Sequence, residues 1–401
     1  MDVQTGLVTL LVVSVVSALA PFIAAVLEGI RLPQVVVLIV GGVLVGPSVL
    51  GWADPASVEL LSDVGLGFLF LLAGYELELG SFRQHAGRLA VVGWLVTAAI
   101  AVAVTGLLAY VGFVRAFVPV ALGLTTTALG TLLPILRENS MLEGRFGSYI
   151  LPAGAVGEFF PVLGIAVFLS ANGQFLGLIS LVAMFGLTAL FTQVPRLGFL
   201  QRFSSITRSG EHATSQTTLR LTVAMLFALL VVASEFGLDV VLGAFLAGVV
   251  LKKWAPGDLH SLETKLDAVG YGFFIPVFFV ASGMNLDLAS IADAPLRLIV
   301  FFLLLLAVRG LPSMVLYRRD LGLNERLQMT FLTATALPLL VALAAVGLST
   351  GHMLPENAAA LVGAGVLSVM VFPGIAVVLH RRSGTSTQDP GRRAQSIENP
   401  A

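Results

Sequence analysis

One carboxylate in this chain lies where membrane proteins rarely place a charge. The run Ser148–Phe168 is mainly apolar and contains a single charged residue, Glu158, near its middle. A charge at the depth of the hydrocarbon costs from ~2.5 to more than ~10 kcal/mol, so a buried acid usually marks an ion path. Such a carboxylate holds either a proton or a small hard cation, because desolvation favours the neutral acid and a bound cation favours the anion. Glu158 is therefore the predicted carrier of both ions.

A second charge is predicted at the same depth. Arg309 lies near the middle of a predicted helix over 297–317, and Glu158 lies near the middle of one over 146–170. At the helical rise per residue, each is ~18 Å from the start of its helix, near the bilayer centre. Two interpretations stay open: Arg309 is a fixed basic partner of the carrier, or the pair is a structural salt bridge that locks two helices.

Threonine-rich motifs occur twice, and each is followed by a proline. Residues 125–131 read TTTALGT and precede Pro134, while residues 333–337 read TATAL and precede Pro338. Because proline interrupts a helix, nearby hydroxyls can satisfy the freed backbone groups or coordinate a cation. The motifs predict two discontinuous helices whose hydroxyls complete a cation site at Thr126, Thr127, Thr333 and Thr335. The alternative is ordinary helix packing, in which Thr hydroxyls bond to the carbonyl four residues earlier.

The composition requires that these residues be positioned by membrane helices. Of the 401 residues, 57% are hydrophobic and 11% are charged, against roughly 25% charged in a soluble domain. Apolar runs of about 20 residues recur along the whole chain, each long enough to cross the hydrocarbon as a helix. We predict an all-α polytopic membrane protein with a retained first helix. The absence of Cys and the net charge of −1 give no indication of a thiolate metal site or of nucleic-acid binding.

The charged and Gly/Pro-rich segments that separate the apolar runs predict about thirteen transmembrane helices. Their ranges are 5–28, 33–50, 59–79, 88–113, 116–136, 146–170, 174–193, 219–236, 238–252, 266–286, 297–317, 326–349 and 358–380. Lys and Arg concentrate in cytoplasmic loops. With the N-terminus outside and the C-terminus in the cytoplasm, 19 of the 22 basic residues fall in the inner loops and the tail, and only Arg115 and Arg297 fall outside. This asymmetry supports both the count and the orientation, in a cell membrane.

Two sequence matches at one offset indicate an internal repeat. Residues 64–79 and 269–288 share a V-G-x-G-F opening and a G-x-x-L-[DE]-L ending, and the two threonine motifs are separated by nearly the same offset. Seven predicted helices separate each pair, so the two halves cross the membrane in opposite senses. An inverted repeat is typical of secondary transporters, whose sites form near the midplane from discontinuous helices.

The domain organisation follows from the repeat. We predict a single transmembrane domain over residues 1–380, with repeats over about 1–170 and 219–380, a linker helix over 174–193 and a cytoplasmic loop over 194–218. The polar, Pro/Gly/Ser-rich segment 381–401 is predicted to be a disordered cytoplasmic tail.

The whole chain resembles the monovalent cation:proton antiporter superfamily, in the branch of bacterial Na⁺/H⁺ exchangers and K⁺ efflux systems. The stretches that carry the resemblance lie in both halves and in the family's order: LPQVVVLIVGGVLVGPSVLG at 32–51, GLGFLFLLAGYELEL at 65–79, GAFLAG at 243–248 and FFIPVFFVASG at 273–283. The resemblance implies a sodium/proton antiporter-like fold with two crossed, unwound helices, usually in a homodimer.

The resemblance also implies roles for individual residues. The family carries two adjacent polar residues in the helix after the first crossing, the second being the carrier, and here the pair is Gly157-Glu158. Glu158 matches the carrier, Gly157 departs from the pattern, and Arg309 matches a basic residue that the family keeps as Lys or Arg. With one acid, we expect an electroneutral 1:1 exchange of H⁺ for Na⁺ or K⁺, driven by the proton gradient without a cofactor.

Other functions fit the same residues less well. The same fold, using Glu158 for protonation, is compatible with proton-coupled export of an organic or antibiotic-like solute. An intramembrane enzyme is disfavoured because no nucleophile or metal-ligand set accompanies Glu158 and Arg309. A passive channel is disfavoured because channels rarely need an inverted repeat with one midplane acid. Neither a G-x-G-x-x-G nor a Walker motif is present, so nucleotide drive is not expected.

Three further acids lie at predicted helix ends. Glu76, Glu78 and Asp287 close the repeated helices at the membrane surface. We expect them to anchor or cap these ends. The alternative is a share in an ion funnel.

Overall fold

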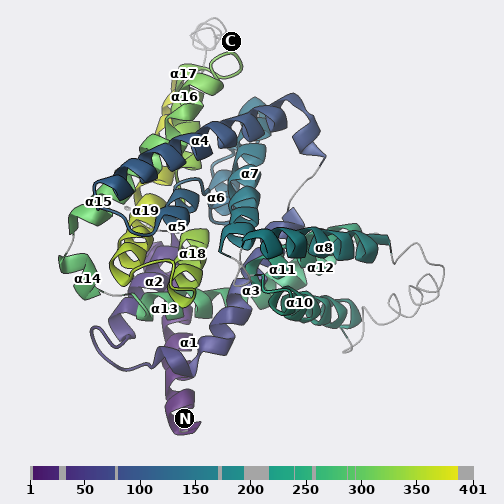
Figure 1. Ribbon diagram of the computed structural model, residues 1–401, viewed down its shortest axis with the longest axis vertical. Coiled ribbons are helices and arrows are strands. Elements are labelled where there is room, and N and C mark those ends of the chain that lie inside the picture. Colours follow the sequence, from purple (N-terminus) through teal and green to yellow (C-terminus); the bar gives the residue numbers. More distant parts are fainter. Residues whose placement is uncertain are drawn as a thin grey trace, which may run out of the picture.

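The computed structural model describes residues 3–26, 33–76, 80–169, 174–193, 216–238, 240–254, 259–286, 288–293 and 295–386, and these residues form helices and connecting turns (Figure 1). The first half contains α1 (Val3–Val26), α2 (Gln34–Val45), α3 (Glu59–Glu76), α4 (His85–Tyr110), α5 (Phe117–Gly123), α6 (Leu129–Glu138), α7 (Gly144–Phe168) and α8 (Gln174–Gln193). The second contains α10 (Thr217–Glu235), α11 (Val240–Trp254), α12 (Leu259–Val269), α13 (Ile275–Met284), α14 (Leu288–Asp293), α15 (Pro295–Leu304), α16 (Pro312–Leu316), α17 (Leu323–Thr333), α18 (Pro338–Ser349) and α19 (Pro355–Ser386).

The helices agree with the predicted all-α membrane architecture. Every predicted range overlaps a helix or a pair of helices. Within the described residues, eight helices are long and apolar enough to cross a membrane, and two shorter ones over Gln34–Val45 and Phe175–Leu190 are apolar. The figure of thirteen crossings stays a prediction. Of the predicted loop over 194–218, residues 194–215 lie outside the described residues, and α10 already begins at Thr217. The predicted disordered tail over 381–401 is described as far as Ser386, and these first six residues continue α19. Glu78 and Asp287 also lie outside the described residues.

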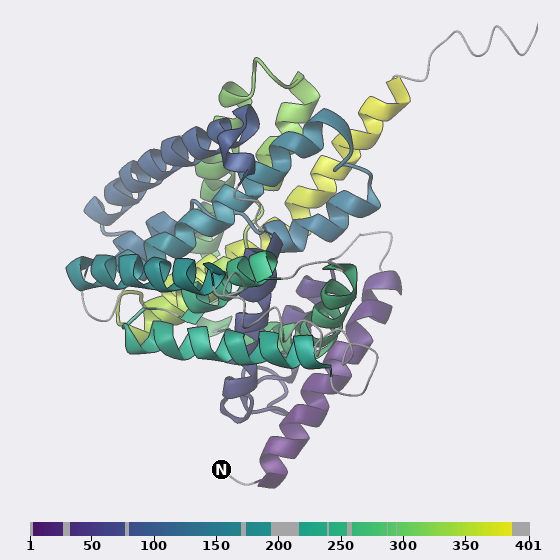
Figure 2. The ribbon, with the colours of Figure 1, turned by 90° about the vertical axis from the view of Figure 1, so that its right-hand side faces the viewer.

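The helices form two bundles. One, here called the crossing bundle, contains α4 to α7 and α15 to α19, and the other, the flanking bundle, contains α1 to α3 and α10 to α13. Helix α8 contacts both α7 and α11 and so connects the two bundles. In Figures 1 and 2, α1 lies toward one end of the molecule, and α4 and α16 lie toward the other.

The flanking bundle contains a close crossing between α3 and α11. Gly74 of α3 lies against the carbonyl oxygen of Phe245, and Gly248 of α11 lies against that of Leu71. A Cβ at either glycine would overlap the facing oxygen, so only glycine permits this approach.

The crossing of α2 with α13 is the repeat-related counterpart of the crossing of α3 with α11. Gly283 of α13 lies against the carbonyl oxygen of Ile39, and Gly42 of α2 lies against that of Val280. Gly283 matches Gly74 of α3 in the repeated sequence, and Gly42 takes the place that Gly248 of α11 has in the first crossing. The predicted repeat is therefore present as the same glycine-mediated contact made twice.

Both predicted discontinuities are present in the crossing bundle. Helix α5 ends at Gly123 and α6 begins at Leu129, and α17 ends at Thr333 before α18 begins at Pro338. In the first break, α6 starts before Pro134, so this proline lies inside a helix. Pro338 is the first residue of α18, where a missing N–H costs no hydrogen bond.

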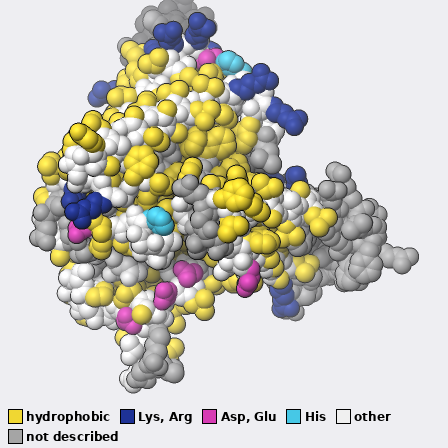
Figure 3. All heavy atoms as spheres, viewed as in Figure 1, with side chains coloured by type: hydrophobic (Ala, Val, Ile, Leu, Met, Phe, Trp, Pro, Cys, Tyr) yellow, Lys and Arg dark blue, Asp and Glu magenta, His cyan; other side chains and the backbone are white. Residues whose placement is uncertain are grey.

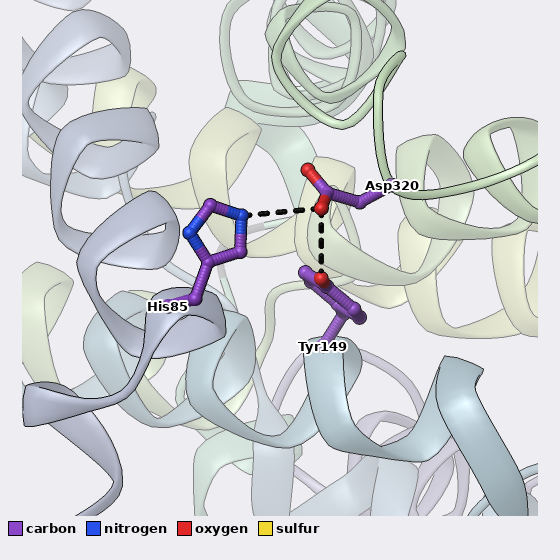
Figure 4. Close-up of polar contacts among 3 residues, drawn as sticks. All are labelled: His85, Tyr149 and Asp320. Carbon is purple, nitrogen blue, oxygen red and sulfur yellow. Dashed lines mark hydrogen bonds and ion pairs between the residues drawn. The ribbon is translucent and has the colours of Figure 1, made fainter.

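One end of the crossing bundle is tied together by polar contacts. His85 at the start of α4 pairs with Asp320 between α16 and α17 at 3.1 Å, and Tyr149 of α7 donates its hydroxyl to the same carboxylate at 3.0 Å (Figure 4). Arg381 of α19 donates to Asn139 after α6 at 3.1 Å. The loops predicted to be cytoplasmic in this bundle thus lie at one end, and Lys and Arg gather over it on the face shown in Figure 3.

Candidate functional site

The two broken helices meet at their breaks. The backbone N–H of Ala128 donates to the carbonyl of Thr335 at 2.8 Å, and the hydroxyl of Thr127 donates to the carbonyl of Thr333 at 2.6 Å. All four residues are buried. The extended segments therefore satisfy part of each other's freed backbone, as unwound peptide inside a membrane protein requires.

A third helix completes each break. The N–H of Thr127 donates to the carbonyl of Gly157 in α7 at 2.9 Å, and the N–H of Ala336 donates to the hydroxyl of Ser368 in α19 at 3.0 Å. Gly157 and Ser368 close matching AGxx[GS] motifs, at 153–157 and 364–368. The repeat thus extends to the two helices that support the breaks.

This equivalence shows where the two halves differ. The residue after Gly157 is Glu158, whereas the residue after Ser368 is Val369. An acid is present on one side of the pseudosymmetric crossing only. The site is therefore built around one carboxylate.

Glu158 lies at the amino end of α6. It is 7% exposed, and its carboxylate lies near the backbone N–H of Gly130, in the first turn of that helix. Free N–H groups and the positive end of the helix dipole stabilise an anion at such a position. Sequence reasoning missed Gly130, although this residue belongs to the repeated threonine motif.

Arg309 lies at the carboxyl end of α17. It is 4% exposed and donates its Nε–H to the hydroxyl of Thr127 at 3.0 Å and its Nη2–H to the carbonyl of Ala153 at 2.9 Å. Thr127 in turn donates to Thr333, the last residue of α17. A cation at the end of a helix, where carbonyls are unpaired, is electrostatically favourable.

The backbone around Arg309 is irregular. Arg309 lies in a π-helical turn, Leu305–Gly310, between α15 and α16. Gly310 packs so closely on α17 that a Cβ there would be 2.6 Å from the carbonyl oxygen of Thr330. π-Turns within helices often occur at functional sites. This turn directs Arg309 toward the crossing.

The two buried charges do not form an ion pair. Among the described residues, which include both charges, the structure contains one ion pair, His85 with Asp320. The structural salt bridge, one of the two interpretations of the sequence, is therefore not formed. Each charge instead faces the end of a half-helix: Glu158 the amino end of α6, and Arg309 the carboxyl end of α17.

Gly157 makes the position of Arg309 possible. A Cβ at Gly157 would be 2.5 Å from Nη2 of Arg309 and 2.5 Å from the hydroxyl of Thr127. The space that a larger residue would occupy is thus filled by the guanidinium and the threonine. Gly157, which stands where the family has the first of two polar residues, therefore leaves the space that Arg309 and Thr127 occupy.

The four predicted threonine ligands are all buried at the crossing, and each hydroxyl donates to a backbone carbonyl. Thr333 and Thr335 bond to the carbonyl four residues back along the chain, as in the packing alternative, whereas Thr127 bonds across the breaks. Their acceptors are Gly123 for Thr126 (2.8 Å), Thr333 for Thr127 (2.6 Å), Met329 for Thr333 (2.7 Å) and Phe331 for Thr335 (3.0 Å). A donating hydroxyl keeps lone pairs with which to approach a cation.

A cavity of about 700 Å³ lies between the two bundles. It extends from Asn139 and Arg381, at the end tied by polar contacts, to Gly130 and Thr131 at the crossing, and Tyr271 of the flanking bundle also lines it. Because Gly130 lies near Glu158, the cavity leads to the first turn of the helix that faces the carboxylate. No local sequence signal indicates this cavity, since residues from both bundles form it.

Comparisons with known proteins cover nearly the whole chain. A family model described as "Sodium/hydrogen exchanger, transmembrane" matches residues 14–381. The putative Na⁺/H⁺ antiporter YjbQ of Bacillus subtilis is 28% identical, over 94% of this chain and 64% of its own length. The Na⁺/H⁺-K⁺ antiporter GerN of Bacillus cereus is 23% identical, over 85% of this chain and 88% of its own length. The chain thus spans less than two thirds of YjbQ.

Solved structures support the fold. A structure of the sodium proton antiporter MjNhaP1 from Methanocaldococcus jannaschii superimposes with a TM-score of 0.68 at 14% identity, covering 97% of this chain and 99% of that one. A second structure of that protein, at pH 8, gives a TM-score of 0.57 at 15% identity, over 92% and 94%. The predicted sodium/proton antiporter-like fold is confirmed.

Proposed function

The chain belongs to the sodium/hydrogen exchanger family, and from that premise we propose that it exchanges a monovalent cation, Na⁺ or K⁺, for H⁺ across the cytoplasmic membrane. The observation that carries the proposal is the setting of Glu158, a 7% exposed carboxylate at the crossing that lies near the backbone N–H of Gly130 at the amino end of α6. It is not neutralised by Arg309. A carboxylate without a basic contact partner is available to a proton or to a metal ion.

Exchange follows from competition for the same oxygens. A proton binds to one carboxylate oxygen and removes the charge that attracts a cation, whereas a bound cation favours the ionised form. Lone pairs of the four threonine hydroxyls and carbonyls of the breaks would complete the coordination of a hard cation, which prefers oxygen ligands. Occupancy by one ion therefore excludes the other.

Oxygen ligands of this kind suit both alkali cations. The names of the relatives include Na⁺ for YjbQ and both Na⁺ and K⁺ for GerN. We propose these two ions as the substrates, and the proton gradient as the energy source.

We further propose that the cycle is electroneutral. Glu158 is the single acid of the crossing, and Gly157 supplies no second one. Arg309 is held by a hydroxyl and a carbonyl, and a guanidinium stays protonated in proteins. One proton then exchanges for one monovalent cation, and the charge of the moving bundle is the same in both directions.

The cavity between the bundles supports alternating access. It opens the crossing toward the end that carries Asn139 and Arg381, which the distribution of Lys and Arg assigns to the cytoplasm. In the proposed cycle, the crossing bundle moves against the flanking bundle so that the carboxylate faces the other side. The N-terminus is outside in this arrangement, and the transporter functions as a homodimer, as the resemblance implies.

The test is proton movement in proteoliposomes challenged with Na⁺, K⁺ and Li⁺. The wild type should release protons on addition of Na⁺ or K⁺, and Glu158→Gln should not, because the amide has no proton to exchange and no charge to attract the cation. Glu59→Gln, an exposed acid at the start of α3, is the matched control and should behave as the wild type. Folding of each variant is checked by its melting temperature. Full exchange in Glu158→Gln would refute the proposal.

A further inference from the structure

A second, much smaller cavity lies inside the crossing bundle. Its volume is about 10 Å³, and residues of α4, α7, α16 and α17 line it together with Arg309 of the π-helical turn. Among the described residues, it shares no lining residue with the 700 Å³ cavity between the bundles. The small cavity is therefore separate from the space through which the crossing is reached. Its volume suits about one water molecule.

The guanidinium of Arg309 has one nitrogen left over. Nε donates to the hydroxyl of Thr127 and Nη2 donates to the carbonyl of Ala153, whereas Nη1 forms no hydrogen bond with the described residues. A buried charged donor without an acceptor is destabilising. Because Arg309 lines the small cavity, an acceptor bound there would supply the missing partner.

The α4 wall of the cavity contains an unpaired hydroxyl. Thr97 of α4 is 0% exposed, and within the described part of the chain its hydroxyl has no hydrogen-bond partner. A buried threonine in a helix commonly donates to the carbonyl four residues earlier, as Thr333 does to Met329. Thr97 lines the cavity without making that bond. Buried polar groups of this kind usually bond to an ordered water when no protein group is available.

The α16 wall supplies an acceptor, which distinguishes water from an anion. Ser313 of α16 and Thr333 both line the cavity, and their hydroxyl oxygens are 3.4 Å apart. Thr333 already donates its proton to the carbonyl of Met329 at 2.7 Å, so Ser313 is the donor within this pair. The lone pairs of Ser313 then remain to accept a hydrogen bond. Water accepts from Arg309 and donates to Ser313, whereas a halide accepts only.

We propose that the small cavity binds one water molecule, which accepts a hydrogen bond from Arg309 and bonds to the hydroxyls of Thr97 and Ser313. The water is the third partner of the guanidinium, after Thr127 and Ala153, and it links Arg309 to α4. It belongs to the crossing bundle and not to the hydration of a transported ion, since its cavity is separate from the one between the bundles. The site does not depend on which cation is exchanged.

The first test is the sign of the change in melting temperature of Thr97→Val. Valine keeps the shape of threonine and removes the hydroxyl, so the variant loses a hydrogen bond to the water and should melt about 1–3 °C lower. Thr97→Ser, which keeps the hydroxyl, should melt closer to the wild type than Thr97→Val does. An empty cavity gives the opposite sign, because valine then removes an unpaired buried hydroxyl. A higher melting temperature for Thr97→Val would overturn the proposal.

Thr105→Val is the matched control. Thr105 lies on the same helix and is also 0% exposed, its hydroxyl has no partner among the described residues, and it does not line the cavity. Removing this hydroxyl should leave the melting temperature unchanged or raise it. A fall equal to that of Thr97→Val would show that the loss does not come from the cavity and would overturn the proposal.

A double variant tests whether one molecule joins the two hydroxyls. Because Thr97 and Ser313 share the water, Thr97→Val and Ser313→Ala together should lower the melting temperature by less than the sum of the two single changes. A fall equal to the sum would mean separate partners and would overturn the shared site. The wild type should melt alike in sodium chloride and in sodium gluconate, and a chloride-dependent shift that disappears in Thr97→Val would assign the cavity to an anion instead.

A direct observation needs no variant. An electron cryo-microscopy map of the wild type in lipid nanodiscs, at a resolution that shows ordered waters, should contain a peak within hydrogen-bond distance of Arg309 and Ser313. A map that shows ordered waters elsewhere in the crossing bundle and none in this cavity would overturn the proposal.

Discussion

Arg309 donates its Nε–H to the hydroxyl of Thr127, 3.0 Å away, and makes no ion pair with Glu158. Through Thr127 it reaches Thr333, the last residue of α17, while Glu158 lies near the N–H of Gly130 at the start of α6. Each buried charge thus compensates the dipole of a different half-helix. The carboxylate is stabilised without being occupied by a basic side chain, which leaves it free to exchange ions.

Replacing Thr127 by Val tests this relationship. Valine has nearly the same shape but removes both the acceptor for Arg309 and the donor to Thr333, so a buried charged donor is left unpaired. We expect a loss of ~1–3 kcal/mol of stability and slower exchange. Thr125→Val is the control, because its hydroxyl donates to the nearby Leu122 at 2.7 Å. Equal melting temperatures in the two variants would contradict the account.

Replacing Gly157 by Ala should displace Arg309. The added methyl group would be 2.5 Å from Nη2 of Arg309 and 2.7 Å from Cβ of Thr127, and Thr127 is fixed by its bonds to the breaks. Overpacking of this kind costs ~1–3 kcal/mol, measured by thermal unfolding. Gly186→Ala in α8, where nothing lies within 4 Å of the new carbon, should be neutral or slightly stabilising. A fully stable Gly157→Ala protein would show that the guanidinium has room to move.

Exchange should be independent of membrane potential. With equal K⁺ on both sides of proteoliposomes, valinomycin holds the potential at zero. In the proposed cycle, one proton exchanges for one monovalent cation, and Arg309 keeps its positive charge throughout. Adding valinomycin should therefore leave Na⁺-driven proton release unchanged. An acceleration by valinomycin would indicate net charge movement and a second titrating group.

The predicted orientation can be read from single cysteines, since the chain contains no Cys. Gln84 precedes α4 and Ala56 lies between α2 and α3, and both are exposed. In intact cells, a membrane-impermeant thiol reagent should label Ala56→Cys and not Gln84→Cys. The pattern should be reversed in inside-out vesicles. Labelling of Gln84→Cys in intact cells would invert the topology.

Much of the fold follows from local sequence signals. The two threonine motifs with their prolines locate breaks that the structure has at 124–128 and 334–337. The glycines of the repeated helices, Gly74 and Gly283, mark close crossings because only glycine allows the backbones to touch. Such signals are readable because each depends on residues near one another in the chain.

The arrangement of the site is less accessible from the sequence. The positions of Glu158 and Arg309 along their predicted helices place both residues at the same depth in the bilayer. These positions do not determine which face of each helix carries the side chain. The π-helical turn at Leu305–Gly310 changes the face from which Arg309 projects, and no residue type in this turn predicts a π-helix. The cavity between the bundles, which Gly130 and Tyr271 line, depends on packing over the whole chain, so no local sequence pattern indicates it.

The most direct measurement of the central claim is the number of protons released when a cation binds. Purified protein in weakly buffered solution is titrated with NaCl or KCl, with choline chloride as the control for ionic strength, and a pH indicator reports the release. The account predicts about one proton per chain for the wild type, at a pH where Glu158 is protonated before the cation binds, and none for Glu158→Gln. Release that persists in Glu158→Gln would contradict it.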